Sequence, residues 1–429
     1  MANPEFSVTM LILGQMSQTV PLGKSSLGGS TLNNLLMGRE TARVGIQLIR
    51  IQMATADVSQ HGGADIWVAS GTYTGRVDCT SSAHLYGGFA GNEETETQRS
   101  WSRNKTIIDL GSSCIFLLAA SSIDGFQIKH GYEGVYCFLR QTAIRNCTIT
   151  DCYIAIINFV DECTVANNVI DQNRGGISCG NVRDTRITGN VLSRNTYGLA
   201  LSDAVVTLRN NTIVSNRTGI SCSRGVTTLV NNIVALNEVG IDSRFGASYV
   251  SRNNDVFGNT LLDTPFAPGP DDISSNPHFT DLANGDFHLK GISPCIDAGT
   301  NDGAPTIDFD GIIRPVDGDC DGVPTTDMGA FEYVPIHVTI DVLPGQSPNH
   351  IVQQPNKLIL VAILGSASFD VGQVDALSVV FGPGRTAEVH GKGHVGDVNF
   401  DGFTDMVLHF RCGETGITQE IRPFTSTGE

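Results

Sequence analysis

The sequence predicts an all-β chain built on a right-handed parallel β-helix, and repeating columns of apolar and asparagine residues indicate that fold. The stretch from Thr142 to Asn259 repeats with a period of 21 or 22 residues. Apolar residues recur once per repeat in two columns: Ile149, Ile170, Leu192, Ile213, Val234 and Val256, and Ile144, Val165, Ile187, Leu208, Leu229 and Val250. A fixed period in this range indicates one supersecondary unit per repeat, stacked on its neighbours.

Asparagine also recurs in two columns: Asn168, Asn190, Asn211, Asn232 and Asn254, and Asn173, Asn195, Asn216, Asn237 and Asn259. Each unit closes on a small residue followed by an aliphatic one, as in Gly176-Ile177 and Gly219-Ile220. Short β-branched runs without helical spacing predict strands. Strands in neighbouring turns then lie about 4.8 Å apart, so equivalent asparagines are expected to hydrogen-bond in ladders. A leucine-rich repeat is the structural alternative, but its denser leucine pattern and helical half are missing.

The recurrent form NNTIVSNRTGI at Asn210–Ile220 resembles the repeats of the pectate-lyase-like superfamily of right-handed parallel β-helices. That superfamily includes polysaccharide lyases, hydrolases, epimerases, adhesins and passive surface proteins. The resemblance therefore implies the fold and leaves the chemistry open.

Residues 1–60 are the least regular, and we expect them to form an N-terminal segment that caps the solenoid. Phe6–Gly14 is apolar but short, with no positively charged leader and no clear cleavage site. It is therefore a poor signal peptide and too short to span a membrane. Ala42–Asp57 is expected to form an amphipathic helix that covers the open end of the β-helix.

Residues 61–262 are expected to form the β-helix, and residues 263–335 an acidic module that closes it. The runs IWVASGTY, LYGGFAGN and QRSWSRNKTIID, between residues 66 and 109, resemble the first turns of bacterial β-helix surface proteins. The runs NPHFTD, NGDFHLKGISPCIDAG and DMGAFEY, between residues 276 and 333, resemble their closing module. The resemblance implies a bacterial origin and a secreted or cell-surface location.

Residues 336–429 are expected to form a small β-sandwich-like domain. Alternating patterns predict strands at His337–Leu343, Lys357–Leu364, Ala376–Phe381 and Met406–Arg411. In the relatives that this part resembles, the domain continues further, so we expect its last strand or two to lie beyond this chain.

The net charge of the chain is −17 and its pI is near 4.9. No basic stripe is evident, which argues against nucleic acid as a partner. An acidic chain suits an extracellular protein that binds cations, although simple solubility is the alternative.

The chain has eleven cysteines. Cys137, Cys179 and Cys222 share a column on alternate turns, roughly 10 Å apart, which is too far for disulfide bonds among them. We interpret them as small buried hydrophobic residues. Cys147 and Cys152 lie on one turn, and we expect them not to pair.

The strongest candidate metal site is the run DVNFDGFTD at residues 397–405. Oxygen ligands at positions 1, 3, 5 and 9 around a glycine are typical of a loop that wraps Ca²⁺. In this chain those positions hold Asp397, Asn399, Asp401 and Asp405, and Phe403 would offer its carbonyl at position 7. Because position 12 is Leu408, we predict a calcium-type loop with fewer ligands than an EF-hand. A plain Asx-rich turn is the alternative.

A second acidic cluster comprises Asp317, Asp319 and Asp321, followed by Gly322. These carboxylates repel one another unless a cation compensates them. Calcium and a solvated acidic loop are both consistent with this run, and in either case we expect a structural role.

The candidate catalytic cluster comprises Glu162, Asp184, Arg183 and Arg186, which the repeat register brings to one corner of the solenoid. Polysaccharide lyases of this fold need a cation or positive charge at a uronate carboxylate and an Arg or Lys base. A salt ladder on the surface is the structural alternative, and we favour it.

The sequence therefore predicts a calcium-stabilised, extracellular or cell-surface β-helix protein that contacts polysaccharide or another surface glycan. The first alternative is a calcium-dependent polysaccharide lyase or epimerase acting on uronate polymers. The second is a purely structural spacer of a larger surface protein. Aromatic residues projecting from one face would favour binding, whereas Arg, Lys and carboxylates converging in a groove would favour an enzyme.

Overall fold

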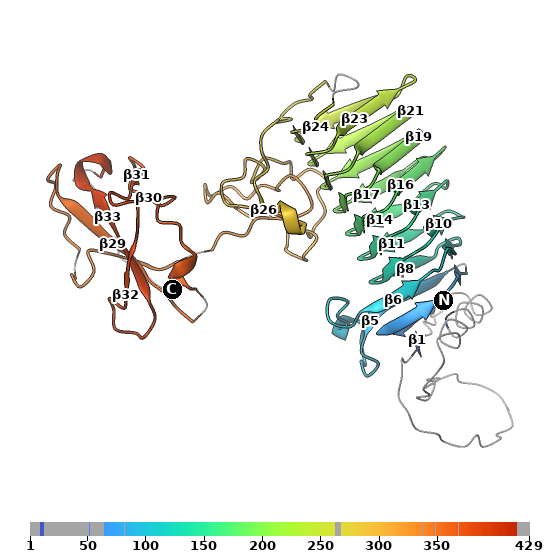
Figure 1. Cartoon of the computed structure of the whole chain (residues 1–429), viewed down its shortest axis with the longest axis horizontal. Coiled ribbons are helices and arrows are strands. Elements are labelled where there is room, and N and C mark those ends of the chain that lie inside the picture. The colour runs from blue at the N-terminus through green and yellow to red at the C-terminus, as the bar shows by residue number, and fades with distance from the viewer. Residues whose placement is uncertain are drawn as a thin grey trace, which may run out of the picture. The chain divides into compact units, whose positions relative to one another are not determined.

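The computed structural model describes residues 9–12, 51, 64–80, 82–261, 267–336, 338–347, 349–367 and 369–417. The chain divides into two compact units, Met1–Pro335 and Ile336–Glu429, and each is described by itself (Figure 1). The predicted capping helix at residues 42–57 lies outside the described residues, except for Ile51. The side chain of Ile51 is fully buried in the core of the solenoid.

The first unit is a parallel β-helix in which each turn contributes one short strand to each of three faces (Figure 1). The first face comprises β4 (Val77–Cys79), β7 (Ile115–Leu117), β10 (Glu133–Cys137), β13 (Ile154–Asn158) and β16 (Gly175–Gly180). The second comprises β1 (Thr9–Ile12), β2 (Ala64–Ala69), β5 (Ala83–Phe89), β8 (Ser122–Asp124), β11 (Ala143–Arg145), β14 (Thr164–Ala166) and β17 (Thr185–Thr188).

Two long strands, β19 (Tyr197–Arg209) and β21 (Thr218–Val230), run through both of these faces. On the last turn the same two faces continue separately as β23 (Val239–Arg244) and β24 (Ser248–Arg252). The third face comprises β3 (Gly71–Thr74), β6 (Thr106–Asp109), β9 (Gln127–Lys129), β12 (Thr148–Thr150), β15 (Val169–Asp171), β18 (Val191–Ser193), β20 (Thr212–Val214), β22 (Ile233–Ala235) and β25 (Asp255–Phe257). The predicted fold class is confirmed.

The predicted apolar columns form the core. The first column pairs residue on residue through the whole third face, from Ile149 to Val256. The second column is confirmed from Ile144 to Leu229, but its last member is wrong. Leu229 pairs with Ser251, and Val250 points outward with 58% of its surface exposed. The Ser251 hydroxyl instead donates to Asp272 at 2.5 Å, where the regular core ends.

Both asparagine columns form continuous hydrogen-bond ladders. In the first ladder, the side-chain amide of Asn211 donates to Oδ1 of Asn232 at 2.9 Å and to the carbonyl of Ile187 at 2.8 Å. Its own Oδ1 accepts from the backbone N–H and the side-chain amide of Asn190, both at 3.0 Å. The side chain of Asn211 is completely buried, so these contacts satisfy its amide without water.

The ladders end in residues that the columns did not predict. Asp272 accepts from the backbone and side-chain N–H groups of Asn254 at 2.7 and 3.0 Å, closing the first ladder. At the other end, Cys147 and Cys152 take the ladder positions of the preceding turn, and their backbone N–H groups donate to Asn168 and Asn173. All eleven cysteines are free, and all except Cys320 are buried.

The small residues that close each unit are required by the close approach of the next turn. A Cβ atom at Gly176 would lie 2.2 Å from the carbonyl oxygen of Gly198, and one at Gly198 would lie 2.6 Å from that of Gly219. Because the obstacle is backbone, it cannot move aside, and glycine keeps the turns at strand spacing.

The module after the solenoid packs along the third face. Phe279, Phe287 and Met328 join a buried cluster with Val214 and Ile233 of the solenoid. Strands β26 (Phe279–Asp281) and β27 (Asp286–Leu289) form a small antiparallel sheet in this module.

Hydrogen bonds from backbone N–H groups to carboxylate oxygens hold the module together. Asp308, for example, accepts from Asp310, Ile312 and Glu332 at 2.7–2.9 Å. Arg314 and Glu332 form a buried ion pair. The acidic character of the module therefore has a structural cause.

The C-terminal unit is a separate small β domain. Its four-stranded antiparallel sheet has the order β28 (Ile340–Val342), β29 (Leu358–Ile363), β33 (Asp405–Arg411) and β32 (His394–Gly396). Strands β30 (Val380–Phe381) and β31 (Thr386–Ala387) form a two-stranded sheet. Ile359, Val361, Leu408 and Phe410 lie in its core.

We predict that Asn211→Ala destabilises the solenoid. The substitution leaves the Ile187 carbonyl without this donor and the N–H groups of Asn190 without their acceptor. Because each buried unpaired group costs roughly 1–3 kcal/mol, the free energy of unfolding should fall by about 2–4 kcal/mol. Guanidinium-induced unfolding followed by circular dichroism measures this change. Ser202→Ala, at an exposed position of β19, is the control and should leave the midpoint unchanged.

Candidate functional site

The first face of the solenoid carries exposed aromatic side chains on the turns of β10, β13 and β19. They are Tyr132, Phe138, Tyr153, Phe159 and Tyr197, with 38–55% of each exposed. Strands β10, β13 and β19 or the residues directly beside them carry these side chains. We call this surface the aromatic platform. Strand alternation sends the intervening residues, such as Val135 and Ile156, into the core.

The rings of the aromatic platform form rows along the solenoid axis. Tyr132 and Tyr153 stack with centroids 4.8 Å apart and planes 8° from parallel. Arg174, on the next turn, continues this row with its guanidinium 4.6 Å from the ring centroid of Tyr153. A second row contains Phe116 and Tyr136, whose centroids are 5.5 Å apart.

A shallow groove of about 220 Å³ crosses the platform between the two flanking tyrosines Tyr153 and Tyr197. Its floor is formed by small residues on neighbouring strands, among them Gly175, Ser178 and Ala200. The groove is therefore lined by two aromatic rings, with the hydroxyl of Ser178 and the guanidinium of Arg174 among the groups beside them.

A larger groove of about 780 Å³ lies between the solenoid and the loop at residues 307–311. Its lining includes Trp101, Lys105 and Arg145 from the solenoid side and Asp308 and Asp310 from the loop. Arg99 also lines the groove, so three cationic and two carboxylate side chains gather there. Sequence reasoning did not find it, because the loop comes from the closing module, more than 150 residues after Arg145.

His288 lies behind Asp310, between two carboxylates. Its Nδ1 is 2.5 Å from Asp286 and its Nε2 is 2.6 Å from Asp310. The hydrogen bond to Asp310, opposed by partial burial and reinforced by Asp286, raises the pKa of His288 to about 9. The imidazole is therefore a cation at neutral pH and holds the groove's loop against β27.

The predicted catalytic cluster lies at one corner, between the first and second faces. Glu162 and Asp184 occupy equivalent left-handed positions on neighbouring turns, with φ of 60° and 53°. Arg186 pairs with Asp184 at 3.1 Å. Arg183 donates from its guanidinium to the backbone carbonyls of Val182 and Asp203 at 2.8 and 2.6 Å.

The structure thus brings the four predicted residues together as neighbours. The contacts of Arg183 and Arg186 tie the corner to itself, as in a surface salt ladder. The aromatic platform and the larger groove are formed by other residues.

The two predicted metal-binding loops fold in the same way. In the C-terminal unit, Asp397 accepts from the backbone N–H groups of Asp401 and Gly402 at 3.2 and 3.0 Å. Asn399 accepts from Asp401 at 3.1 Å, and Asp401 accepts from Phe403 at 2.9 Å.

The loop of the closing module makes the corresponding hydrogen bonds, at 2.8–3.1 Å. Asp317 accepts from the backbone N–H groups of Asp321 and Gly322. Asp319 accepts from the backbone N–H of Asp321, and Asp321 accepts from that of Val323. Both loops therefore fold oxygen-bearing side chains around a tight turn.

One predicted ligand is placed differently from the others, and one acidic neighbour was missed. Asp405 is fully buried and accepts from the backbone N–H groups of Gly365 and Val398 at 2.8 and 2.9 Å, so it anchors the loop. In the closing module, oxygens of Asp297, Asp317 and Asp319 lie within 4.8 Å of one another. These acidic groups are able to hold a metal ion.

A family model described as "Periplasmic copper-binding protein (NosD)" matches residues 94–271. Among solved structures, the A-module of the mannuronan C-5 epimerase AlgE4 from Azotobacter vinelandii is similar at 16% identity, over 50% of this chain and 74% of that chain, with a TM-score of 0.33. Pectin methylesterase from Aspergillus niger is similar at 15% identity, over 55% and 85%, with a TM-score of 0.26. A search of curated proteins found no match.

The first unit of the chain is a parallel β-helix. Three parallel faces per turn and the pairing of equivalent columns between turns establish that architecture from the structure itself. Among the described residues, no helix is long and apolar enough to cross a membrane.

Several cysteines in the matched range are poorly suited to bind copper, although Cys137 lowers the pKa of Cys163, with their sulfur atoms 3.7 Å apart. The described part of 94–271 offers one histidine, His130, whose Nδ1 lies 3.0 Å from Asp109, and seven buried cysteines. Burial raises the pKa of Cys147 to about 12 and that of Cys152 to about 11, so these groups remain thiols. A metal ligand must be the thiolate.

We predict that the stabilisation by His288 depends on pH. The folded pKa of about 9 exceeds the unfolded value of about 6.5, so the contribution is complete below about pH 6.5 and is lost as the pH rises through about 9. His288→Gln should therefore lower the melting temperature at about pH 6 and have no effect near pH 10. An equal effect at both pH values would contradict this assignment, and His350→Gln is the control.

Proposed function

We propose that this protein binds polysaccharide on the aromatic platform, as an extracytoplasmic β-helix protein. The observation that carries the proposal is the set of exposed rings on one face, on the turns of β10, β13 and β19. Exposed apolar surface gathered on one rigid face is a feature of interaction sites. Tyrosine combines an apolar ring with a polar hydroxyl, which suits a partner that is itself part apolar and part polar.

A polysaccharide fits the chemistry and the periodicity of this surface. A sugar ring presents C–H groups on its faces and hydroxyl groups around its edge. The groove between Tyr153 and Tyr197 offers rings at its sides and a hydroxyl at Ser178. Because the solenoid repeats this pattern about every 4.8 Å, the platform extends in one direction, as a polymer does.

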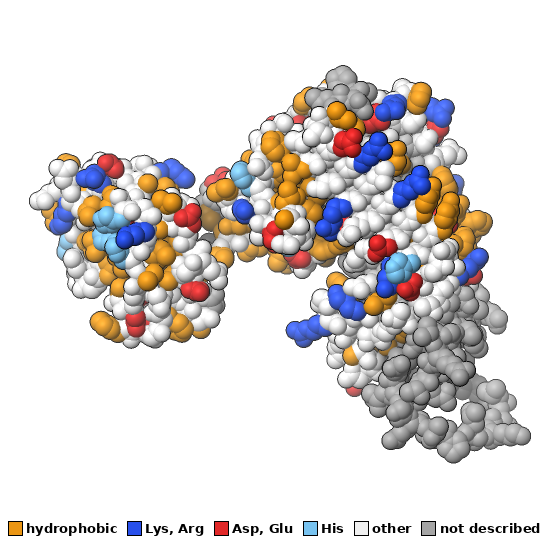
Figure 2. Space-filling model, viewed as in Figure 1, with side chains coloured by type: hydrophobic (Ala, Val, Ile, Leu, Met, Phe, Trp, Pro, Cys, Tyr) orange, Lys and Arg blue, Asp and Glu red, His pale blue; other side chains and the backbone are white. Residues whose placement is uncertain are grey.

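The charges on the platform favour an acidic polysaccharide. Arg174 lies against Tyr153, and Arg76 lies 4.3 Å from the centroid of Phe116. Each guanidinium stays charged and offers a planar fork of donors that matches a carboxylate. Figure 2 shows Lys and Arg side chains spread over the solenoid without forming one basic stripe on the face in view. Arg76 is also paired with Asp78 at 2.8 Å, so Arg174 is the cation that favours a uronate unit on this face.

We place the protein outside the cytoplasm, in the periplasm or at the cell surface. The similarity of residues 94–271 to a family described as periplasmic supports this location. An acidic chain with acidic loops suits a compartment rich in divalent cations.

Calcium is proposed as a structural ligand of the two acidic loops. Both loops direct carboxylate and amide oxygens to one turn around a glycine, and Ca²⁺ prefers such oxygen ligands. Asp397, Asn399 and Asp401 would hold the ion in one loop, with Phe403 offering its carbonyl. Asp317, Asp319 and Asp297 would hold the ion in the other. Asp405 would not bind the ion but would orient the first loop through its hydrogen bonds from the backbone N–H groups of Gly365 and Val398.

A lyase or epimerase acting on uronate polymers is the second candidate, and the larger groove favours it. Lys105 and Arg145 face Asp310 across this groove, so a cation to neutralise a uronate carboxylate and a second basic group are available. The corner with Arg183, Arg186, Glu162 and Asp184 is the other candidate location, but the contacts of Arg183 with the backbone favour a structural role there.

We predict that Tyr153→Ala weakens binding to acidic polysaccharides by about tenfold or more, because a central aromatic anchor contributes that much at a typical interface. Affinity electrophoresis in gels containing pectate or alginate measures the change. Trp101→Ala is the matched control, since Trp101 is an exposed aromatic residue that lines the other groove.

Loss of binding in Trp101→Ala with none in Tyr153→Ala would move the site to the larger groove. Ultraviolet absorbance of unsaturated products tests the lyase alternative in the same samples. A rise that disappears in Lys105→Ala would contradict a purely binding role.

We predict that chelation of calcium lowers the melting temperature of the full chain, and that Asp401→Ala reduces the difference. Carboxylates that lose a bound cation repel one another. Differential scanning fluorimetry with Ca²⁺ and with EGTA measures the shift. Asp375→Ala, at an exposed turn of the same unit, is the control. Identical melting curves with Ca²⁺ and with EGTA would contradict calcium binding by either loop.

A further inference from the structure

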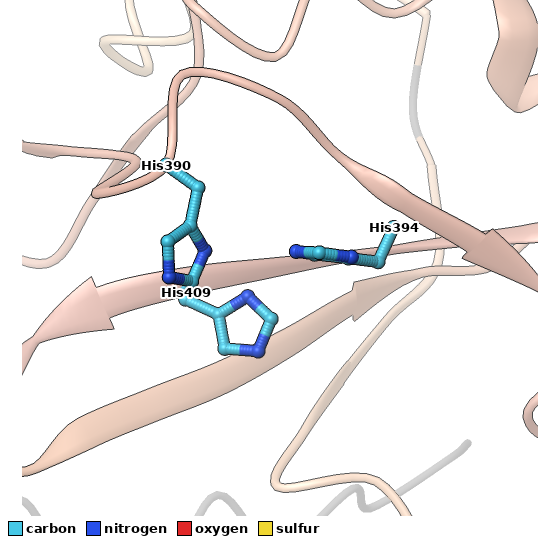
Figure 3. A group of neighbouring side chains, drawn as sticks. All are labelled: His390, His394 and His409. Carbon is cyan, nitrogen blue, oxygen red and sulfur yellow. The ribbon is translucent and has the colours of Figure 1, made fainter.

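Three histidines of the C-terminal unit converge on one point (Figure 3). Ring nitrogens of His390, His394 and His409 lie within 4.8 Å of one another. The ring centroids are 4.8–5.5 Å apart, and the ring planes are inclined by 69–88°. Figure 3 shows the three rings turned toward one another rather than stacked. The cluster is open to solvent, since His390 and His394 are exposed.

The sheet brings these residues together from three separate segments. His394 begins the edge strand β32 and pairs with Val407 of β33. His409 lies two residues further along β33, on the same face as Val407, so its ring is a diagonal neighbour of His394. The segment after β31 is held beside them, because the backbone N–H of Val389 donates to the carbonyl of His409 at 3.0 Å.

A buried carboxylate supports the cluster. The side chain of Glu388 is fully buried, and one of its oxygens lies 3.3 Å from Nδ1 of His390 and 3.8 Å from Nδ1 of His409. Its carboxylate accepts hydrogen bonds from the backbone N–H groups of His390, Lys392 and His409 at 2.6, 3.3 and 3.3 Å, which fix it beside the imidazoles.

His409 has a buried ring nitrogen that makes no hydrogen bond to any described residue, since the carboxylate of Glu388 is 3.8 Å away. Among the described residues, Nδ1 of His409 is a buried polar atom with no hydrogen bond. A buried nitrogen without a hydrogen bond calls for a ligand.

We propose that His390, His394 and His409 form a binding site for a divalent transition-metal ion of the Zn²⁺ class. Three imidazoles supply the nitrogen ligands that zinc, copper and nickel prefer, whereas calcium and magnesium prefer oxygen. Ligand nitrogens about 2.0–2.1 Å from one zinc ion lie roughly 3.3 Å apart, so the exposed side chains close by about an ångström on binding. Glu388 offsets the charge of the ion and orients the rings, as carboxylates behind metal-bound histidines do.

Three protein ligands leave a further coordination position open to solvent. Such a site differs from a structural zinc site with four protein ligands, because water or an exogenous oxygen ligand takes the remaining position. The site is separate from the two acidic loops, which offer oxygen donors only. It also lies outside residues 94–271, so the copper-binding family description does not assign it.

Isothermal titration of Zn²⁺ into the full chain tests the proposal. The protein carries no histidine tag, and excess Ca²⁺ occupies the acidic loops. We expect one tight Zn²⁺ site per chain. His394→Ala should weaken binding by at least about 100-fold, more than the roughly 10–100-fold lost when an outer-shell group is removed. Cu²⁺, used as a paramagnetic probe, should show hyperfine coupling to imidazole nitrogen.

His350→Ala is the matched control, since it removes an exposed histidine of the same unit and should leave Zn²⁺ affinity unchanged. His394 lies on an exposed edge strand, so its variant is expected to fold, which circular dichroism checks. His390→Ala is the second variant and should show the same loss. Absence of Zn²⁺ binding by the wild-type chain, or equal affinity in wild type, His390→Ala and His394→Ala, would overturn the proposal.

Discussion

The asparagine ladders are the constraint on which the rest of the solenoid depends. Each buried asparagine uses both functions of its amide: the oxygen accepts from the preceding turn and the nitrogen donates to the following one, as Asn211 does. A buried amide without these partners would cost more than it contributes. The ladders therefore fix the register between turns, because a slip of one residue would leave a row of buried amides unsatisfied.

Fixed register converts sequence period into a spatial array. Equivalent residues lie one above another, so rings separated by 21 residues, such as Tyr132 and Tyr153, come into contact. The same geometry explains the corner where Arg183 and Asp184 lie. The closing module adds what the repeat alone cannot provide, since its loop at residues 307–311 brings carboxylates opposite Lys105 and Arg145. Function in this chain thus arises where regular columns carry unusual residues or where a non-repeating segment crosses them.

The sequence predicted the features that the period controls. The apolar columns, both ladders and the absence of pairing among Cys137, Cys179 and Cys222 followed from counting residues, because one register fixes them all. The register failed to predict the last turn, where Ser251 rather than Val250 pairs with Leu229. The core ends there, and the Ser251 hydroxyl donates a hydrogen bond to Asp272. The same counting could have revealed the aromatic platform. Its columns are aromatic on only some turns, however, so no column stood out in the sequence.

The missed parts of the candidate sites depend on contacts between distant segments. Asp297 approaches Asp317 and Asp319 only after the closing module folds. Asp405 matched a ligand position by spacing, but burial in β33 turned it toward Gly365. His390 and His394 have the H-x₃-H spacing of many zinc ligands, which the sequence analysis did not single out. His409 joins them only through the pairing of β32 with β33. Local patterns carry no information about such pairing.

The central claim is that the aromatic platform is the surface that contacts polysaccharide. Hydroxyl-radical footprinting with mass spectrometry, with and without an acidic polysaccharide, tests it most directly, because exposed aromatic rings are oxidised readily. The account predicts that the polysaccharide protects Tyr132, Tyr153 and Tyr197 and leaves Trp101 as reactive as before. Protection of Trp101 with unchanged oxidation of the three tyrosines would contradict it and place the contact in the larger groove.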